Sequence, residues 1–135
     1  LFQTSVGADE ILTGIEVPVL DHHQVAEYAK MAHPATGFAL VGAAVVVTVH
    51  EGRCSALTVA VGGLVPGPIR ARSVEASLVG QELNAETVAA AAAHLSDDVG
   101  DNATGDFFAS AEYRKVIAAV EVKHALNHAI GLAHH

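Results

Sequence analysis

The sequence is poor in aromatic residues, in positive charge and in cysteine. It has 135 residues with no tryptophan and 4% aromatic residues, and 7 Lys and Arg stand against 15 Asp and Glu, which gives a formal net charge of −8. Binding to a phosphate backbone needs clustered positive charge, so we do not expect nucleic acid as a partner. The single cysteine, Cys54, cannot form an internal disulfide. This suits a reducing compartment, and we expect a cytoplasmic protein.

Long apolar runs are also missing. The longest run, around residues 38–47, is much shorter than the roughly 20 residues that span a bilayer. The start of the chain lacks the charged and apolar regions of a secretory signal, so we predict neither a membrane span nor export. The chain opens on Leu1 without an initiator methionine and closes on His134 and His135, a pair typical of the start of an expression tag. We interpret residues 1–135 as a single domain cut from a longer protein, and we exclude the last two histidines from any site.

The chain is rich in small aliphatic residues, and they predict a core of Ala and Val side chains. Two runs dominated by β-branched and small residues, 45–49 and 56–61, are separated by a short polar break that contains Gly52. This pattern is typical of a β-hairpin, which we predict over strands 38–50 and 54–65.

Two earlier strands complete a predicted sheet. Residues 10–17 carry alternating apolar side chains and stop at Pro18, which has no N–H to donate. Residues 24–33 are ambiguous, because Val25, Tyr28 and Met31 also have helical spacing. Pro34 favours extended geometry for the residue before it, so we predict a strand.

The second half of the chain changes to a helical period. We predict helices over 72–79, over 85–95 with Asn84 as N-cap, and over 110–132, with an acidic loop at 96–105. The early apolar stripe of the last helix is formed by Tyr113, Val116, Ile117 and Val120. Strands followed by helices indicate an α+β fold, in which a four-stranded antiparallel sheet is covered by three helices on one face.

Several side chains have chemistry to offer, but each has an ordinary structural explanation. The candidates are His22 and His23 in a polar connection, Glu121, His124 and His128 on the last helix, Asp97, Asp98 and Asp101 in the acidic loop, the carboxylates Glu10 and Glu16, and Cys54 at a strand start. Adjacent histidines in a strand would point to opposite faces. The helical group has the i, i+4 histidine spacing of zinc sites, but its third ligand lies far away. We therefore predict no catalytic and no metal-binding residue.

Lys30 remains open on these grounds. It shares a strand face with Tyr28 and precedes the small, irregular segment 33–37. It is either an exposed lysine of an edge strand or a functional group.

Four blocks in order resemble a known family. They are residues 10–18 (EILTGIEVP), residues 28–42 with the segments YAK and HPATGFA and the pair Val41 and Gly42, residues 59–70 with VAVGGLVPGP and Arg70, and residues 109–114 (ASAEYR). Together, over nearly all of residues 9–131, they resemble the C-terminal domain of the FAD-binding medium subunit of molybdenum hydroxylases, the carbon monoxide dehydrogenase and xanthine dehydrogenase relatives.

The resemblance implies an antiparallel sheet of four strands covered by three helices. It also implies that FAD is held mainly by two earlier domains of the same subunit, and that this domain closes over one side of the flavin. Partner subunits would carry a molybdenum cofactor and two 2Fe-2S clusters, from which FAD would pass electrons to an external acceptor. The domain alone is then not catalytic and does not retain FAD.

Two cofactor contacts follow from the resemblance. Leu12 matches an aliphatic residue near the isoalloxazine ring, and Lys30 matches a lysine near the flavin, where a positive charge favours the reduced form. This chain departs from its relatives at Gly37, where they often carry Asp, and His33 and Pro34 replace a basic pair. The rival hypotheses are a free-standing interaction module that forms homo-oligomers without a cofactor, and a histidine-based metal-binding domain.

Overall fold

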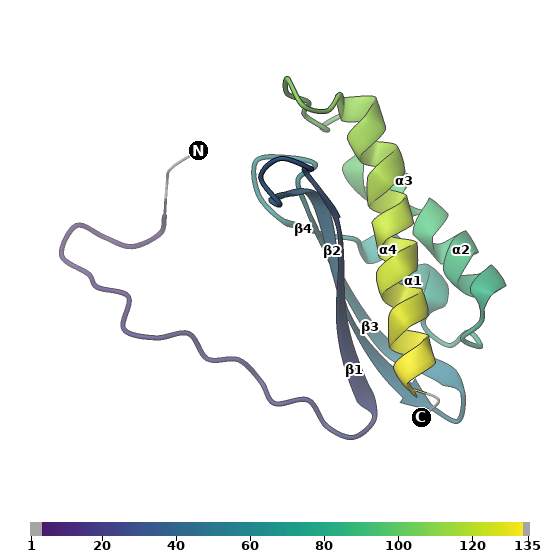
Figure 1. The fold of residues 1–135 in the computed structure, drawn as a ribbon. Coiled ribbons are helices and arrows are strands. Elements are labelled where there is room, and N and C mark those ends of the chain that lie inside the picture. Colours follow the sequence, from purple (N-terminus) through teal and green to yellow (C-terminus); the bar gives the residue numbers. More distant parts are fainter. Residues whose placement is uncertain (1–3, 134–135) are drawn as a thin grey trace.

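A computed structural model describes residues 4–133. A four-stranded sheet has the order β1-β2-β3-β4, and every neighbouring pair is antiparallel. The strands are β1 (Gln24–Ala32), β2 (Ala39–His50), β3 (Arg53–Gly62) and β4 (Ile69–Arg70), and the helices are α1 (Arg72–Leu78), α2 (Ala85–Ala93), α3 (Leu95–Val99) and α4 (Ala111–Ala133). All helices lie on one side of the sheet (Figure 1). The predicted α+β fold is confirmed.

The hairpin between β2 and β3 is tighter than the sequence suggested. His50 pairs with Arg53, so only Glu51 and Gly52 form the loop. Both have positive φ, 51° and 74°. A two-residue loop with two left-handed residues matches the twist of the strands that it joins. Gly52 therefore provides the geometry that closes the hairpin.

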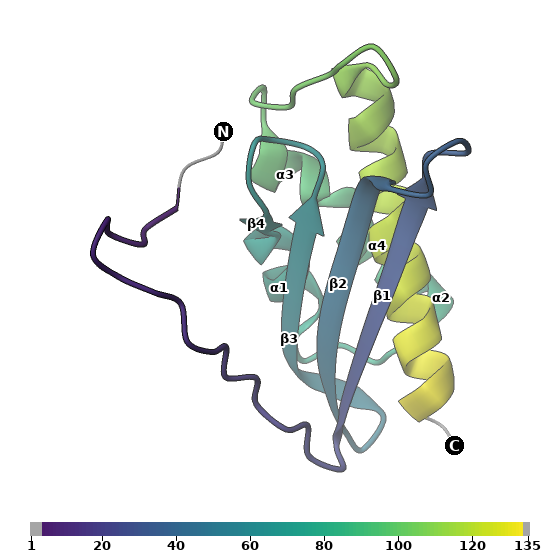
Figure 2. The same ribbon diagram turned by 60° about the vertical axis from the view of Figure 1, so that its left-hand side comes forward.

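The core is built from small side chains between the inner face of the sheet and the helices. Fully or almost fully buried side chains include Val41, Val45, Val47, Val59 and Val61 of the strands and Ala118, Val122, Ala125, Leu126 and Ala129 of α4. Alanines on the inward face of α4 let the helix lie close to β1 and β2, along which it runs in Figure 2. No helix among residues 4–133 is long and apolar enough to cross a membrane.

The predicted strand over residues 10–17 is wrong. Residues 4–22 form no strand, and the side chain of every one is exposed. This segment stands away from the sheet on the side opposite the helices (Figure 1). A strand needs a neighbour for its N–H and C=O groups, and no described residue pairs with these. The fourth strand is instead the short β4.

Two helical predictions are also corrected. The acidic loop at 96–105 opens with α3, because Leu95 and Val99, one turn apart, are both buried. The early stripe of α4 largely faces outward, with Tyr113, Val116 and Val120 exposed. The inward face instead begins with Arg114 and continues through alanines, and apolar spacing alone does not distinguish the two faces. The predicted N-cap Asn84 is confirmed, and it accepts hydrogen bonds from the backbone of Glu86 and Thr87.

Glu75 explains why β4 is so short. Its carboxylate accepts hydrogen bonds from the backbone N–H of Val59, at 2.8 Å, and from the guanidinium of Arg70, at 2.8 and 2.9 Å. It thereby satisfies a β3 donor that a longer β4 would pair. Burial alone would raise the pKa of Glu75, but the hydrogen bonds from Arg70 and Val59 together outweigh it and hold this pKa below its ordinary value.

We expect Glu75 to make stability sensitive to acid. A carboxyl whose pKa is lower in the folded state contributes stability above its unfolded pKa, and this contribution is lost as pH falls through the folded pKa. The unfolding temperature of the wild type should therefore fall more than that of Glu75→Gln between neutral pH and about pH 3. Thermal denaturation followed by circular dichroism checks this, and parallel pH profiles would contradict it.

Candidate functional site

Lys30 lies on the open face of the sheet, which no helix covers. It is exposed on β1, as is Tyr28 two residues earlier. Its ammonium group donates a hydrogen bond to the carbonyl oxygen of Gly37 at 3.1 Å. Gly37 has a φ of 71°, which few residues other than glycine adopt. Lys30 thus anchors the β1–β2 turn while it presents positive charge to the open face.

A hollow adjoins Lys30 on this face. Its volume is about 330 Å³, and it is lined by Tyr28, Ala39, Gly42, Ala44, Ala60, Val61, Gly62, Gly63 and Pro68. Lys30 pairs with Gly42 across the strands, and Gly42 pairs in turn with Gly62. A side chain at position 42 would collide with the Tyr28 hydroxyl. The Tyr28 side chain therefore lies over Gly42, whereas no atom lies within 4 Å of a Cβ placed on Gly62, which leaves open space in the hollow.

Leu12 does not join this site in the structure. Its side chain is 66% exposed, and it belongs to the segment 4–22 that stands away from the sheet (Figure 1). The two predicted cofactor residues therefore face the same side of the molecule but are not brought together.

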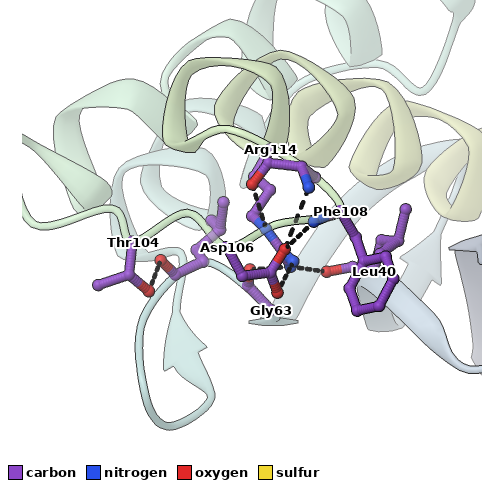
Figure 3. Close-up of polar contacts among 8 residues, drawn as sticks. Leu40, Gly63, Thr104, Asp106, Phe108 and Arg114 are labelled. Carbon is purple, nitrogen blue, oxygen red and sulfur yellow. Dashed lines mark hydrogen bonds and ion pairs between the residues drawn. The ribbon is translucent and has the colours of Figure 1, made fainter.

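A buried guanidinium fixes the end of the sheet next to this face. Arg114 is 7% exposed. It donates to the carbonyl oxygens of Leu40, at 2.5 Å, and Gly63, at 3.0 Å, and to the carboxylate of Asp106, at 2.6 Å (Figure 3). The hydrogen bond from Arg114 holds the pKa of Asp106 below its usual range. Arg114 thereby ties α4 to β2, to the turn after β3 and to the loop before α4.

Sequence reasoning missed the structural importance of Arg114. Its position was the available signal, because Arg114 lies four residues before Ala118 on the face of α4 that continues through Val122 and Ala125. A single arginine at the start of a buried helical stripe indicates a guanidinium with internal partners.

The remaining candidates have structural partners or inert surroundings. Cys54 is fully buried, and burial raises the pKa of its thiol to about 11, which disfavours the reactive thiolate form. Asp98 accepts hydrogen bonds from the backbone and hydroxyl of Ser73 near the start of α1. Glu121 is buried and lies 3.6 Å from the ring of His124.

The paired histidines do not diverge as an extended strand would require. His22 and His23 lie in a turn, and their ring centroids are 3.9 Å apart. The ring centroids of His23 and His50 are 5.7 Å apart. Within residues 4–133, no three side chains of the metal-ligating types are arranged to hold an ion.

The fold, Lys30 and the hollow beside it define a class of protein. It is an α+β domain whose open sheet face carries a lysine and an apolar hollow. The family model described as the CO dehydrogenase flavoprotein C-terminal domain matches residues 26–129. The chain belongs to this family, which is the flavoprotein medium-subunit domain of molybdenum hydroxylases.

Individual relatives agree with this assignment. The chain is 31% identical over 119 residues to a glyceraldehyde dehydrogenase medium chain from Sulfolobus acidocaldarius, covering 88% of this chain and 41% of the relative. It is 32% identical over 113 residues to a nicotine 6-hydroxylase medium subunit from Paenarthrobacter nicotinovorans, covering 84% of this chain and 38% of the relative. The chain thus spans about two fifths of the length of these relatives.

A solved structure shares the fold. A chain of a carbon monoxide dehydrogenase from Hydrogenophaga pseudoflava, which lacks the Mo-pyranopterin moiety of its molybdenum cofactor, superposes with a TM-score of 0.77 at 29% identity. The match covers 87% of this chain and 40% of that one.

We expect Arg114→Met to destabilise the domain by about 3 kcal/mol, because it removes the hydrogen bonds of a buried guanidinium to the carbonyl oxygens of Leu40 and Gly63 and to the Asp106 carboxylate. The matched control is Arg53→Met, since Arg53 is exposed and its guanidinium donates to the Gly80 carbonyl alone among residues 4–133. The control should lose at most about 1 kcal/mol. Urea denaturation of both variants measures this. Equal losses would show that the Arg114 contacts carry no special weight.

The Cys54 thiol should react slowly while the domain is folded. With a pKa of about 11 and no exposure, its reaction with a colorimetric disulfide reagent at mildly alkaline pH should be at least roughly 100-fold slower than in denaturant. Comparable rates in the two conditions would mean that the start of β3 opens readily.

Proposed function

We propose that this chain is the C-terminal domain of a flavoprotein subunit that holds FAD and relays electrons from iron-sulfur clusters to an external acceptor in a molybdenum hydroxylase. Membership of the flavoprotein family carries this proposal. The position of Lys30 beside an apolar hollow supports it. Residues 1–135 are a single domain of a longer subunit and contain no catalytic residue of their own.

The residues on the open face fit a flavin. A planar ring system needs an open apolar surface, which the hollow at Gly62 supplies, and an ammonium group stabilises negative charge on a reduced ring. FAD, when bound, supplies reversible electron transfer between the clusters and the acceptor. Lys30 orients and electrostatically favours the reduced cofactor, and its bond to the Gly37 carbonyl fixes its position.

The earlier part of the same subunit supplies the remaining contacts. The segment 4–22 leaves the sheet on its open side (Figure 1) and exposes seven large apolar side chains, which are Val6, Ile11, Leu12, Ile15, Val17, Val19 and Leu20. A contiguous group of exposed apolar side chains usually marks a surface that another part of the protein or a partner covers. We place the FAD-binding domains between this segment and the open face, where Leu12 approaches the ring.

The partners of the subunit are an iron-sulfur small subunit and a molybdopterin large subunit. They supply the molybdenum cofactor and two 2Fe-2S clusters. We place this complex in the cytoplasm, where a free buried thiol such as Cys54 persists. The row of exposed apolar residues also favours a second candidate, a free-standing interaction module that forms homo-oligomers without flavin.

The test replaces Lys30 in the full-length polypeptide, purified with the subunits that accompany it. The wild type should show flavin absorption, with iron and molybdenum in the complex. Lys30→Met should keep its flavin but lower the reduction potential by on the order of 30 mV, because a nearby positive charge is lost. Spectroelectrochemical titration measures this.

The matched control for this test is Lys123→Met, which removes an exposed lysine of α4 and should leave the potential unchanged. An unchanged potential in Lys30→Met would remove Lys30 from the site. A colourless full-length protein would contradict the flavoprotein proposal and leave the interaction module.

A further inference from the structure

The β1–β2 turn, residues 33–38, is closed on its inside by a histidine ring. His33 Nδ1 lies 3.3 Å from the backbone nitrogen of Ala35, whose N–H donates to it, and 3.4 Å from the hydroxyl oxygen of Thr36. The same hydroxyl oxygen accepts a hydrogen bond from the backbone N–H of Phe38 at 3.3 Å. One ring nitrogen thus joins the start of the turn to its middle and, through Thr36, to its end.

These contacts determine which ring nitrogen carries a proton. A backbone N–H can only donate, so Nδ1 of His33 presents its lone pair to Ala35. The turn therefore selects the neutral imidazole, with its single proton on Nε2. A protonated ring would carry an N–H on both nitrogens and would set one of them against the N–H of Ala35. The turn as it stands needs the neutral ring.

The same turn delivers the partner of Lys30. The N–H of Gly37 donates to the carbonyl oxygen of His33 at 2.8 Å, and the carbonyl oxygen of Gly37 accepts from the Lys30 ammonium group at 3.1 Å. A lysine side chain has a long flexible stem, so the position of its ammonium group is set by what it binds. The position of Lys30 therefore depends on the conformation of the turn, which includes the His33 contacts.

The His33 ring is itself held from the helical layer. It is partly buried, and it meets the ring of Phe108 edge to face, with centroids 4.6 Å apart. The backbone N–H of Phe108 donates to Asp106 at 2.9 Å, and the other carboxylate oxygen of Asp106 is bound by Arg114 (Figure 3). Turning the ring away from Ala35 would also break its contact with Phe108.

The charged groups around the His33 ring come from three elements. Lys30 of β1 binds the turn, Arg114 of α4 binds the chain just after it, and Asp106 of the loop before α4 is already held by Arg114. Of the six residues that line the small hollow beside the ring, His33 alone titrates near neutral pH. Within residues 4–133, no ion pair joins this ring to a carboxylate. No described carboxylate is therefore placed to hold the ring in its protonated form.

We propose that His33 is a positioning residue for Lys30. Its neutral ring accepts from the N–H of Ala35 and holds the turn, so that the Gly37 carbonyl fixes the ammonium group. Protonation of the ring removes this acceptor and loosens the turn, which makes the position of Lys30 dependent on pH. The effect on electron transfer rests on the proposed function, because it takes Lys30 to act on a flavin, whereas the link between His33 and the turn does not.

Hydrogen exchange tests the link between His33 and the turn. In the full-length polypeptide, purified with the subunits that accompany it, His33→Leu should exchange the amides of residues 33–38 about fivefold faster than the wild type at neutral pH, because the side-chain acceptor is lost. His33→Asn should exchange as the wild type does, because the asparagine oxygen accepts from the backbone two residues on. Equal rates in the wild type and His33→Leu, or no rescue by asparagine, would overturn the proposal.

The pH profile of the same measurement separates the ring from a merely structural side chain. Between about pH 7.5 and about pH 5.5, after correction for the intrinsic exchange rate, the wild type should lose protection in residues 33–38, because the ring takes up a proton. His33→Asn should keep its protection, because its side chain does not titrate. A wild-type profile as flat as that of His33→Asn would contradict the proposed role of the proton.

Spectroelectrochemical titration tests the link to Lys30. His33→Leu should lower the flavin reduction potential in the same direction as Lys30→Met but by less, and His128→Leu, which removes an exposed histidine of α4, should not change it. Because His33 acts through Lys30, the double variant should match Lys30→Met alone. Additive shifts would overturn the positioning role. A colourless wild type would instead overturn the proposed function, and the exchange measurements would still decide the role of His33.

Discussion

The fold depends on the hydrogen bonds of one buried guanidinium. Arg114 reaches the carbonyl oxygens of Leu40 and Gly63 from the first turn of α4, and it holds Asp106 of the preceding loop. A Cβ at Gly63 would collide with the Leu40 carbonyl oxygen, so the two carbonyls converge only because position 63 is glycine. The arginine and the glycine together set where the helical layer meets the end of the sheet.

Below that point the packing relies on close approach. The face of α4 toward the sheet carries Ala118, Ala125 and Ala129, and the inner strand positions are mostly valine. Small side chains bury less apolar area each, so stability needs a short distance between the layers. The opposite face of the sheet has no such cover, and its small residues form a floor beside Lys30. One composition therefore produces a dense core on one face and an accessible hollow on the other.

The sequence was sufficient where local rules decide the structure. The turn at Gly52, the cap at Asn84 and the change from strands to helices along the chain followed from local pattern, because turn and cap geometry depend on a few neighbouring residues. The strand prediction at Ile15 and Val17 was wrong, since alternation indicates a strand but does not show whether a partner strand is present. Tyr113 and Val116 misled for a related reason: spacing identifies an apolar face of α4, but only tertiary contacts show which face is buried. The partners of Arg114 and the hollow at Gly42 could not be located without the folded chain, because each is assembled from distant residues.

The β1–β2 turn, residues 33–38, connects the two surfaces of the domain. Lys30 holds this turn from the open face through the carbonyl of Gly37, and Arg114 holds the chain directly after it through the carbonyl of Leu40. His33 and Phe38 of the same turn line a second hollow together with Phe108. A shift of the turn would therefore move the lysine of one surface and the rings of the other together. Because both anchors bind backbone carbonyls, the coupling depends on the path of the chain, and this path includes the positive φ of Gly37, which few other residues adopt.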